Sequence, residues 1–254
     1  MKNGAFALID CLGFKGLWKN GHEQLLSKLR LVKTSVREGL QVFFKNPNHP
    51  LHFNPDFFTP EVRLLSDTVA ISLTNRKKEI DPFIDLLAIA ATTQAVVDLF
   101  LENEPHLLLR GCITHGMHII EENFLIGPAV DETAEYMDSA QGAFVWFLPN
   151  AATIIEVTLA SMKKDNDVIF SFLDVMCPPY RVPIKAGHHL DTRVINPIIN
   201  KSPEVAGRLM EVCAKAMDVN KMDVWIKRQH TLKFLTYCKE QNDRLIDVVK
   251  NKRG

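Results

Sequence analysis

The chain has 254 residues, of which 46% are hydrophobic and 24% charged, so it can form one large domain with a buried core. Its 30 basic residues balance its 30 acidic residues, and this zero net charge gives no reason to expect a nucleic acid or an anionic membrane as partner. The five cysteines are widely spaced and form no CxxC pair, which argues against a disulfide framework or a zinc site and favours a reducing cytoplasm. They are Cys11, Cys112, Cys177, Cys213 and Cys238.

Neither of the two most apolar stretches predicts a membrane segment. The N-terminal run is interrupted by Asp10, Gly13 and Lys15, so it is not expected to be a signal peptide. The stretch FIDLLAIAATTQAVVDLFL at 83–101 contains two aspartates and three polar residues, and we interpret it as a buried helix. No stable membrane insertion is expected.

The first half of the chain alternates between strand and helix patterns. The pattern predicts, in order, a strand at 5–11, a helix at 21–44, a Pro- and Asn-rich loop at 46–60, a hairpin at 61–73 and a helix at 79–102. Long ordered loops are often functional, so the loop is of interest in itself.

The second half begins in the same alternating way and ends in helices. It predicts a strand at 106–116 with MHIIEE returning beside it, a helix at 127–140, a strand at 143–148, a helix at 151–163, strand or loop at 168–198, and helices at 203–217 and 221–250. This order of elements favours an α+β fold, in which a sheet is layered with helices.

Two aspartates occupy the ends of predicted strands. Asp10 lies in the first strand, and Ser66 and Asp67 form the two-residue turn of the hairpin. Each alone is typical of a structural cap or turn. If the first strand lies beside the hairpin, however, the two carboxylates converge and repel one another unless a cation lies between them. Magnesium commonly binds through one or two carboxylates together with substrate phosphates.

Four blocks around these residues resemble the class III nucleotidyl cyclases. They are FALIDCLGF, RLLSDTVAISL, LLLRGCITHG and GPAVDETAEYMDSAQG, and their order is the same as in that family. The resemblance covers about residues 5–148. It implies a ferredoxin-like cyclase catalytic domain with a central, mostly antiparallel sheet at 1–165. A C-terminal helical extension at 166–254 would pack on the same domain.

The resemblance also assigns residues to a metal and phosphate site. It implies that Asp10, Cys11 and Asp67 bind two Mn²⁺ or Mg²⁺ ions, with the two aspartates as the catalytic residues. Gly13 and Phe14 match the turn whose backbone approaches the triphosphate, and glycine permits that close approach. A plain turn glycine is the alternative for Gly13.

The positions that read the base in purine cyclases differ here. Arg63, four residues before Asp67, stands where those enzymes commonly have a lysine, and an arginine can donate to a pyrimidine carbonyl or stack on the ring. Phe124 stands near the position of their base-reading acid, which argues against that mode of adenine recognition. Ser66 joins Arg63 in the predicted nucleotide-binding set.

The helix at 127–140 departs most from the purine enzymes. Asp131 and Glu135 stand where those enzymes have an asparagine and a transition-state arginine, and a register shifted by one gives Glu132 and Tyr136. Asp131 and Tyr136 are nevertheless predicted to contact nucleotide, although a core aromatic is the alternative for Tyr136. Arg110 is nearby in the preceding strand, where we interpret it as structural. A degenerate, inactive relative is therefore a second hypothesis.

These departures resemble the pyrimidine cyclases of bacterial Pycsar anti-phage systems. The resemblance implies a cytoplasmic homodimeric lyase that converts UTP or CTP to cyclic UMP or cyclic CMP and pyrophosphate, and a separate effector activated by the product. The choice between UTP and CTP stays open. The alternatives are a cyclase-fold nucleotide sensor without turnover and a purine (adenylate) cyclase. The motif His188-His189-x-Asp191 is interpreted as a surface loop.

Overall fold

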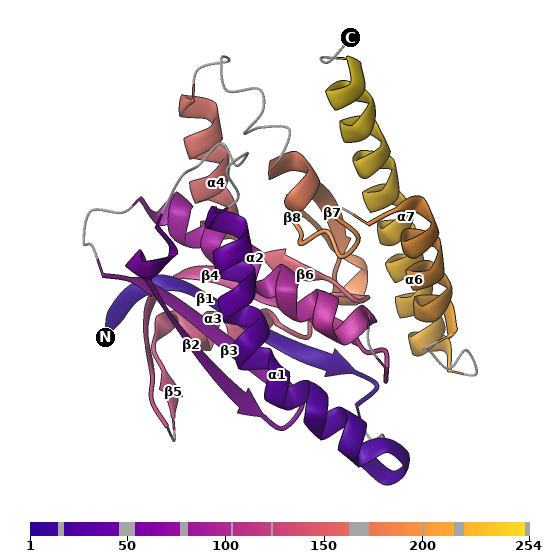
Figure 1. The fold of residues 1–254 in the computed structure, drawn as a ribbon, viewed down its shortest axis with the longest axis horizontal. Helices are drawn as coiled ribbons and strands as arrows, with labels where there is room; N and C mark the ends of the chain where they lie inside the picture. The colour runs from indigo at the N-terminus through magenta and orange to yellow at the C-terminus, as the bar shows by residue number, and fades with distance from the viewer. Residues whose placement is uncertain are drawn as a thin grey trace.

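The computed structural model describes residues 1–14, 18–45, 54–76, 81–102, 104–122, 124–162, 173–199, 201–215 and 221–251. A central sheet runs through the molecule, with the long helices α1 and α2 on one side and the C-terminal helices α6 and α7 beside it (Figure 1).

The first part of the chain builds the core of this sheet. Its elements are β1 (Lys2–Leu12), α1 (Trp18–Lys45), the short 3₁₀ helix η1 (Pro55–Phe57), β2 (Phe58–Leu65), β3 (Thr68–Asn75), α2 (Pro82–Glu102) and β4 (Leu108–Ile120). The strand order is β2-β3-β1-β4, and every neighbouring pair is antiparallel. A βαββαβ chain with this order is the ferredoxin-like arrangement, so the predicted fold class is confirmed.

The second part extends the sheet and covers it. Its elements are β5 (Leu125–Ile126), α3 (Pro128–Tyr136), β6 (Val145–Phe147), α4 (Pro149–Ser161), β7 (Pro179–Pro183), β8 (His189–Arg193), α6 (Pro203–Lys215) and α7 (Met222–Asn251). β5 pairs with the end of β4, β6 runs parallel to β4, and β7 and β8 form a separate two-stranded ribbon.

Several predicted boundaries are wrong. β4 continues to Ile120 instead of turning back at 117, because His118 is buried and its Nε2 lies 2.7 Å from the Ser72 hydroxyl of β3. The helix predicted to reach 140 ends at Tyr136. The predicted loop at 46–60 ends earlier, since Phe58 begins β2, and its first part lies outside the described residues. Residues 173–176, predicted as strand or loop, are helical.

The two faces of the sheet bury different amounts of apolar surface. Ala7 and Ile9 of β1 point toward α1 and α2 and belong to the main hydrophobic cluster. Phe6 and Leu8 point the other way, into a smaller cluster that includes Ala129 of α3. Because side chains alternate along a strand, Asp10 shares this second, thinly covered face.

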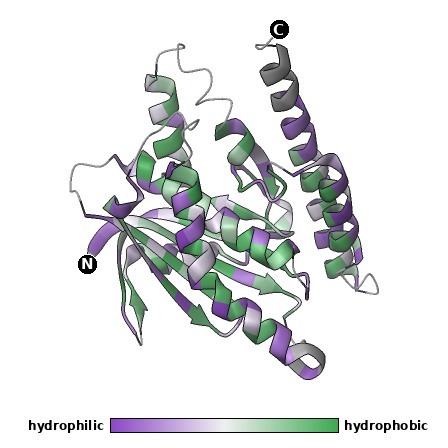
Figure 2. Cartoon of the chain, viewed as in Figure 1, coloured by the Kyte–Doolittle hydropathy of each residue, from purple (hydrophilic) through white to green (hydrophobic). Residues whose placement is uncertain are grey.

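Helix α2 is the central core helix. By length and composition it could cross a membrane, but 89% of its apolar window is buried inside the protein. Its interpretation as a buried helix is confirmed, and Figure 2 shows it as one of the most hydrophobic elements of the molecule.

The C-terminal helices contact the same core as the sheet. Cys213 of α6 and Phe234, Leu235 and Cys238 of α7 belong to the main buried cluster. The predicted division of the chain between 165 and 166 falls outside the described residues and stays a prediction. All five cysteines are free and buried, which confirms that the chain forms no disulfide framework.

Candidate active site

Asp10 lies near the C-terminal end of β1, between two neighbouring strands. Its register partners are Thr68 of β3 and Arg110 of β4. Its side chain is only 13% exposed, and its Oδ2 accepts hydrogen bonds from Arg110 Nε at 3.2 Å and Arg110 Nη2 at 3.1 Å. Burial raises the pKa of the Asp10 carboxyl, Arg110 opposes this shift, and the charges of Asp67 and Asp138 add to it. The site therefore holds more negative charge than Arg110 neutralises.

Asp67 is brought to the same end of β1 by the β2–β3 hairpin. The two-residue turn is tight because Ser66 adopts a positive φ of 62°. The backbone amide of Cys11 donates to the Asp67 carbonyl at 3.1 Å, which ties the hairpin tip to β1. The convergence of Asp10 and Asp67 that the sequence predicted is thus present in the structure.

Cys11 presents only its main chain to this site. Its side chain belongs to the main core on the opposite face of the sheet from Asp10. Burial raises the pKa of the Cys11 thiol to about 12, and the charges of Asp10 and Asp67 contribute to this shift. A thiol with this pKa stays protonated at neutral pH and is not a metal ligand.

The turn after β1 is open. Gly13 has a φ of 76°, which favours glycine, and an added Cβ there would meet no atom within 4 Å. Phe14 is half-buried and packs against the main core. The turn is therefore anchored on one side and open on the other.

Two further charged residues reach the site from distant parts of the chain. Arg110 Nη1 lies 3.5 Å from the carbonyl oxygen of Asp138, just after α3. Lys185 Nζ donates to Asp138 Oδ2 at 2.7 Å and lowers the pKa of the Asp138 carboxyl. Arg110 was interpreted as a structural residue of its strand, and neither Asp138 nor Lys185 was predicted at the site, since their approach depends on tertiary contacts.

Arg63 occupies a different part of the same sheet face. Its Nε donates to the Glu121 carbonyl at 3.1 Å, and its Nη1 donates to the Val62 carbonyl at 3.0 Å. Together with Glu122 and Phe124 it lines a cavity of about 400 Å³. The structure thus brings together Arg63 and Phe124, the two positions singled out for base recognition.

The predicted residues of α3 have unequal surroundings. Asp131 and Glu135 are exposed, whereas Glu132 is half-buried and its Oε2 accepts a hydrogen bond from Thr114 Oγ1 at 2.7 Å. Tyr136 is 42% exposed, and the neighbouring Glu135 raises the pKa of its hydroxyl. The core alternative for Tyr136 is therefore wrong.

We next consider whether the described side chains alone could form a metal site. Within it, no group of three or more His, Cys, Asp or Glu side chains is arranged to hold a metal ion. His188, His189 and Asp191 are all exposed, as expected of a surface segment, but the prediction of a loop is wrong for His189 and Asp191, which pair with β7 as part of β8. Any metal at Asp10 and Asp67 would thus need ligands beyond this chain's side chains, such as main-chain oxygens, substrate phosphates and water.

The comparisons with known proteins find similarity in structure and none in sequence. No family model and no curated protein matches the chain. Among solved structures it is similar to the catalytic core of a rhodopsin-guanylyl cyclase with converted specificity, in complex with ATPalphaS. The sequence identity is 9%, the match covers 76% of this chain and 94% of the other, and the TM-score is 0.47. At this score the fold assignment rests on the strand order and register described above.

Proposed function

We propose that this chain is a metal-dependent nucleotidyl cyclase that converts UTP or CTP to the 3′,5′-cyclic monophosphate and pyrophosphate. The observation that supports this most is the convergence of Asp10 and Asp67 at the end of β1, beside an arginine and an open glycine turn. In the role implied by the resemblance, the product activates a separate effector in anti-phage defence.

The residues at this site fit a hard divalent ion. Asp10 Oδ1 has no hydrogen-bond partner among the described residues, and the raised pKa of Asp10 reflects burial and the like charge of Asp67. Carboxylate oxygens are the ligands that Mg²⁺ and Mn²⁺ prefer, so Asp10 and Asp67 would hold two such ions with the main-chain oxygen of Cys11. Bound there, the ions would polarise the α-phosphate and neutralise the charge of the leaving pyrophosphate.

The surrounding residues support a triphosphate. In the reaction the 3′-hydroxyl gives its proton to water, the 3′-oxygen bonds to the α-phosphorus, and the bond from that phosphorus to the bridging oxygen of the β-phosphate breaks, so that pyrophosphate leaves. Arg110 Nη1 has only a 3.5 Å contact to a carbonyl and can turn to a phosphate oxygen. The exposed turn at Gly13 leaves space for the phosphates beside Asp10.

The cavity at Arg63 suits a pyrimidine base. Arg63 Nη2 has no hydrogen-bond partner among the described residues, so it can donate to O2, a carbonyl that uracil and cytosine share. Phe124 is 44% exposed and offers a face for stacking. Since both bases carry O2, these two residues leave the choice between UTP and CTP open.

We further propose that the enzyme is a head-to-tail homodimer. Exposed apolar side chains border the second face of the sheet, where the helices leave it thinly covered. They are Leu65, Phe124 and Tyr136. Such a patch marks an interaction surface. In this dimer one protomer supplies Asp10 and Asp67 and its partner supplies α3.

A second candidate is a nucleotide sensor without turnover. Asp131, Glu132 and Glu135 make α3 acidic, and its sequence contains no lysine or arginine. A helix of this charge cannot stabilise the negative charge that develops on a transferring phosphoryl group. If no other cation replaces the missing arginine, the fold binds nucleotide and metal but makes no cyclic product.

Product analysis separates the two candidates. Purified protein is incubated with UTP, CTP, ATP or GTP and Mn²⁺, and the products are identified by mass spectrometry. A cyclic pyrimidine nucleotide that disappears in Asp67→Asn but persists in the exposed control Glu211→Gln supports the enzyme. A triphosphate-dependent rise in melting temperature without product supports the sensor, and a cyclic purine product contradicts the base assignment.

The dimer predicts complementation between two inactive variants. Asp67→Asn damages the metal side of a site, and Tyr136→Ala damages the α3 side. In a mixture, a heterodimer contains one site with both defects and one intact site, so activity returns. If the protein is monomeric by light scattering, or if the mixture stays inactive, the proposed dimer is wrong.

A further inference from the structure

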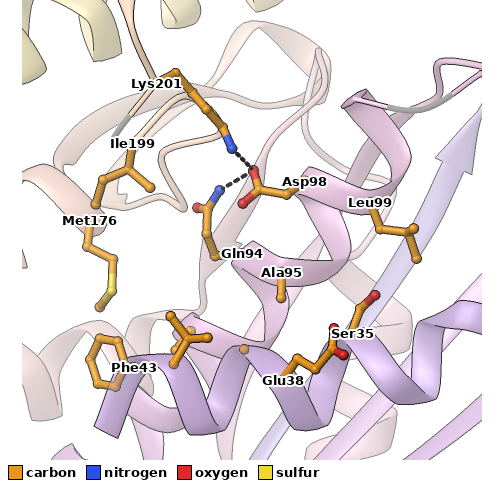
Figure 3. A pocket seen from close by; sticks show the side chains of 13 residues that line it. Ser35, Glu38, Phe43, Gln94, Ala95, Asp98, Leu99, Met176, Ile199 and Lys201 are labelled. Atoms are coloured by element: carbon orange, nitrogen blue, oxygen red, sulfur yellow. Dashed lines mark hydrogen bonds and ion pairs between the residues drawn. The ribbon is translucent and has the colours of Figure 1, made fainter. Parts of the chain in front are cut away.

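A second pocket lies between α1 and α2, on the side of the sheet opposite to Asp10. Its volume is about 480 Å³, within the range of small-molecule sites. Figure 3 shows that its walls come from α1, from α2 and from the two segments that carry Met176 and Ile199. It belongs to none of the cyclase blocks and has no part in the proposed reaction.

Close packing of the helices fixes one boundary of this pocket. An added Cβ at Gly39 would lie 2.6 Å from the Ala95 Cβ and 3.1 Å from the Ala91 carbonyl oxygen. The two helices therefore touch at small residues, and larger side chains on either side of this contact form the walls. Because these small residues let the two helices pack closely, we expect the pocket to be formed before any ligand binds.

The walls are apolar and one of them is exposed. Met176 and Ile199 are buried on the far side of the pocket, and Met176 points toward Phe43. Val42 is 73% exposed, an unusual setting for a valine on a helix of a folded domain. A ligand with an apolar body would cover Val42 and contact the other walls.

The polar end of the pocket has more acceptors than donors. Asp98 Oδ1 accepts from Lys201 Nζ at 3.2 Å and from Gln94 Nε2 at 3.1 Å, while Asp98 Oδ2 has no partner among the described residues. Gln94 is only 8% exposed, and its Oε1 accepts no hydrogen bond. The Glu38 carboxylate also has no partner in the part of the chain that the structure describes.

The charges at this end are also unbalanced. Lys201, the cation that lines the pocket, is shared between Asp98 and Glu102. Among the described residues that line the pocket, the carboxylates Glu38 and Asp98 thus face one ammonium group, which Glu102 outside the lining also binds. A buried carbonyl without a donor, such as that of Gln94, is energetically unfavourable. Both features favour a positively charged group that donates hydrogen bonds.

We propose that this pocket binds a small organic amine, with its ammonium group between Glu38 and Asp98 and its apolar body against Val42 and Phe43. The ammonium supplies the donors that Asp98 Oδ2 lacks and neutralises one of the excess carboxylates. Burial raises the pKa of the Asp98 carboxyl, and a bound cation offsets that effect. The inference is independent of the proposed cyclase activity, because it concerns only this pocket.

The test uses the full chain and three probes with the same eight-carbon tail: n-octylamine, n-octanol and octanoate. Binding is followed by NMR of ¹³C-methyl-labelled methionine, in which Met176 reports on the pocket wall and its signal is assigned from Met176→Leu. We expect octylamine to shift the Met176 signal at concentrations about tenfold lower than octanol, and octanoate to bind more weakly still.

Variants locate the ammonium group. Glu38→Gln, at an exposed position, and Asp98→Asn, which leaves Lys201 its partner Glu102, should each weaken octylamine binding about tenfold and leave octanol binding unchanged. Glu211→Gln on α6 is a matched control and should change neither the binding of octylamine nor the binding of octanol. The proposal is overturned if octylamine and octanol bind equally, if both pocket variants keep the wild-type affinity for octylamine, or if the Met176 signal never moves.

Discussion

Replacing Arg110 by methionine isolates the charge balance at Asp10. The Arg110 and Asp10 side chains are 16% and 13% exposed, and Asp10 Oδ2 receives both of its hydrogen bonds from Arg110. Removing one partner of a fully buried ion pair costs about 3–5 kcal/mol, whereas an exposed pair contributes about 0–1 kcal/mol. For this mostly buried pair we expect Arg110→Met to lower the free energy of unfolding by about 2–3 kcal/mol.

The cause of this loss can be checked with a double-mutant cycle in urea. If the loss comes from an uncompensated carboxylate, the double variant Asp10→Asn/Arg110→Met should recover about 2 kcal/mol relative to Arg110→Met alone. Arg63→Met is the matched control, since Arg63 lies on the same sheet face but donates only to backbone carbonyls. The loss in free energy of unfolding caused by Arg63→Met should be the same with and without Asp10→Asn.

The effect of Mn²⁺ on the free energy of unfolding of the same variants provides a second test. Millimolar Mn²⁺ should raise the free energy of unfolding of Arg110→Met by more than that of the wild type, because Arg110 no longer occupies Asp10 Oδ2. In Asp10→Asn/Arg110→Met this gain should disappear. Additive effects of the two substitutions, or a Mn²⁺ effect that is equal in all variants, would refute the account of the site.

Three further predictions concern stability in parts of the protein away from Asp10 and Asp67. Burial lowers the pKa of Lys28 to about 8, so between about pH 8 and pH 10 the unfolded chain holds a proton that the folded protein has released. Urea unfolding should therefore show the wild type gaining stability over Lys28→Met across that range, and a constant difference would contradict this. Gly127→Ala should cost more than about 2 kcal/mol, because φ is 129° and the new Cβ would lie 2.6 Å from the Met117 carbonyl oxygen; a cost below about 1 kcal/mol in thermal unfolding would show that the turn adapts. Arg193→Met should cost about 1–3 kcal/mol, since the Cys177 carbonyl loses a 2.8 Å hydrogen bond from a buried guanidinium, and an unchanged urea midpoint would mean that water replaces it.

Local patterns were enough to predict the order of the core elements. The alternation of strand and helix periods, and the two-residue turn at Ser66 and Asp67, led to the hairpin and to an α+β sheet layered with helices, both of which the structure contains. The ferredoxin-like strand order was implied by the resemblance to the class III cyclases. They also placed Asp10 at the end of its strand. Each of these features depends on residues that are close in sequence, so short-range periodicity and turn chemistry carry the information.

The contacts that complete the site depend instead on strand register and on distant segments. Arg110 lies 100 residues from Asp10 in sequence, and Lys185 lies 47 residues from Asp138. No local pattern specifies which residue of β4 lies opposite Asp10. For the same reason, the extension of β4 past 117 was not predicted, because it follows from the burial of His118 against another strand.

The placement of Asp10 is hard to explain by stability alone. A buried ion pair can often be replaced by apolar residues of similar volume at no cost, because desolvation of two charges offsets their attraction. Asp10 and Arg110 lie on a sheet face where Phe6 and Leu8 already form an apolar cluster, and apolar residues could extend it. The chain instead keeps a carboxylate with one unpartnered oxygen, next to a second carboxylate and an open turn. Such an arrangement is costly in a folded protein unless a bound cation and ligand offset it, and this is the physical reason to look for metal and triphosphate at this end of β1.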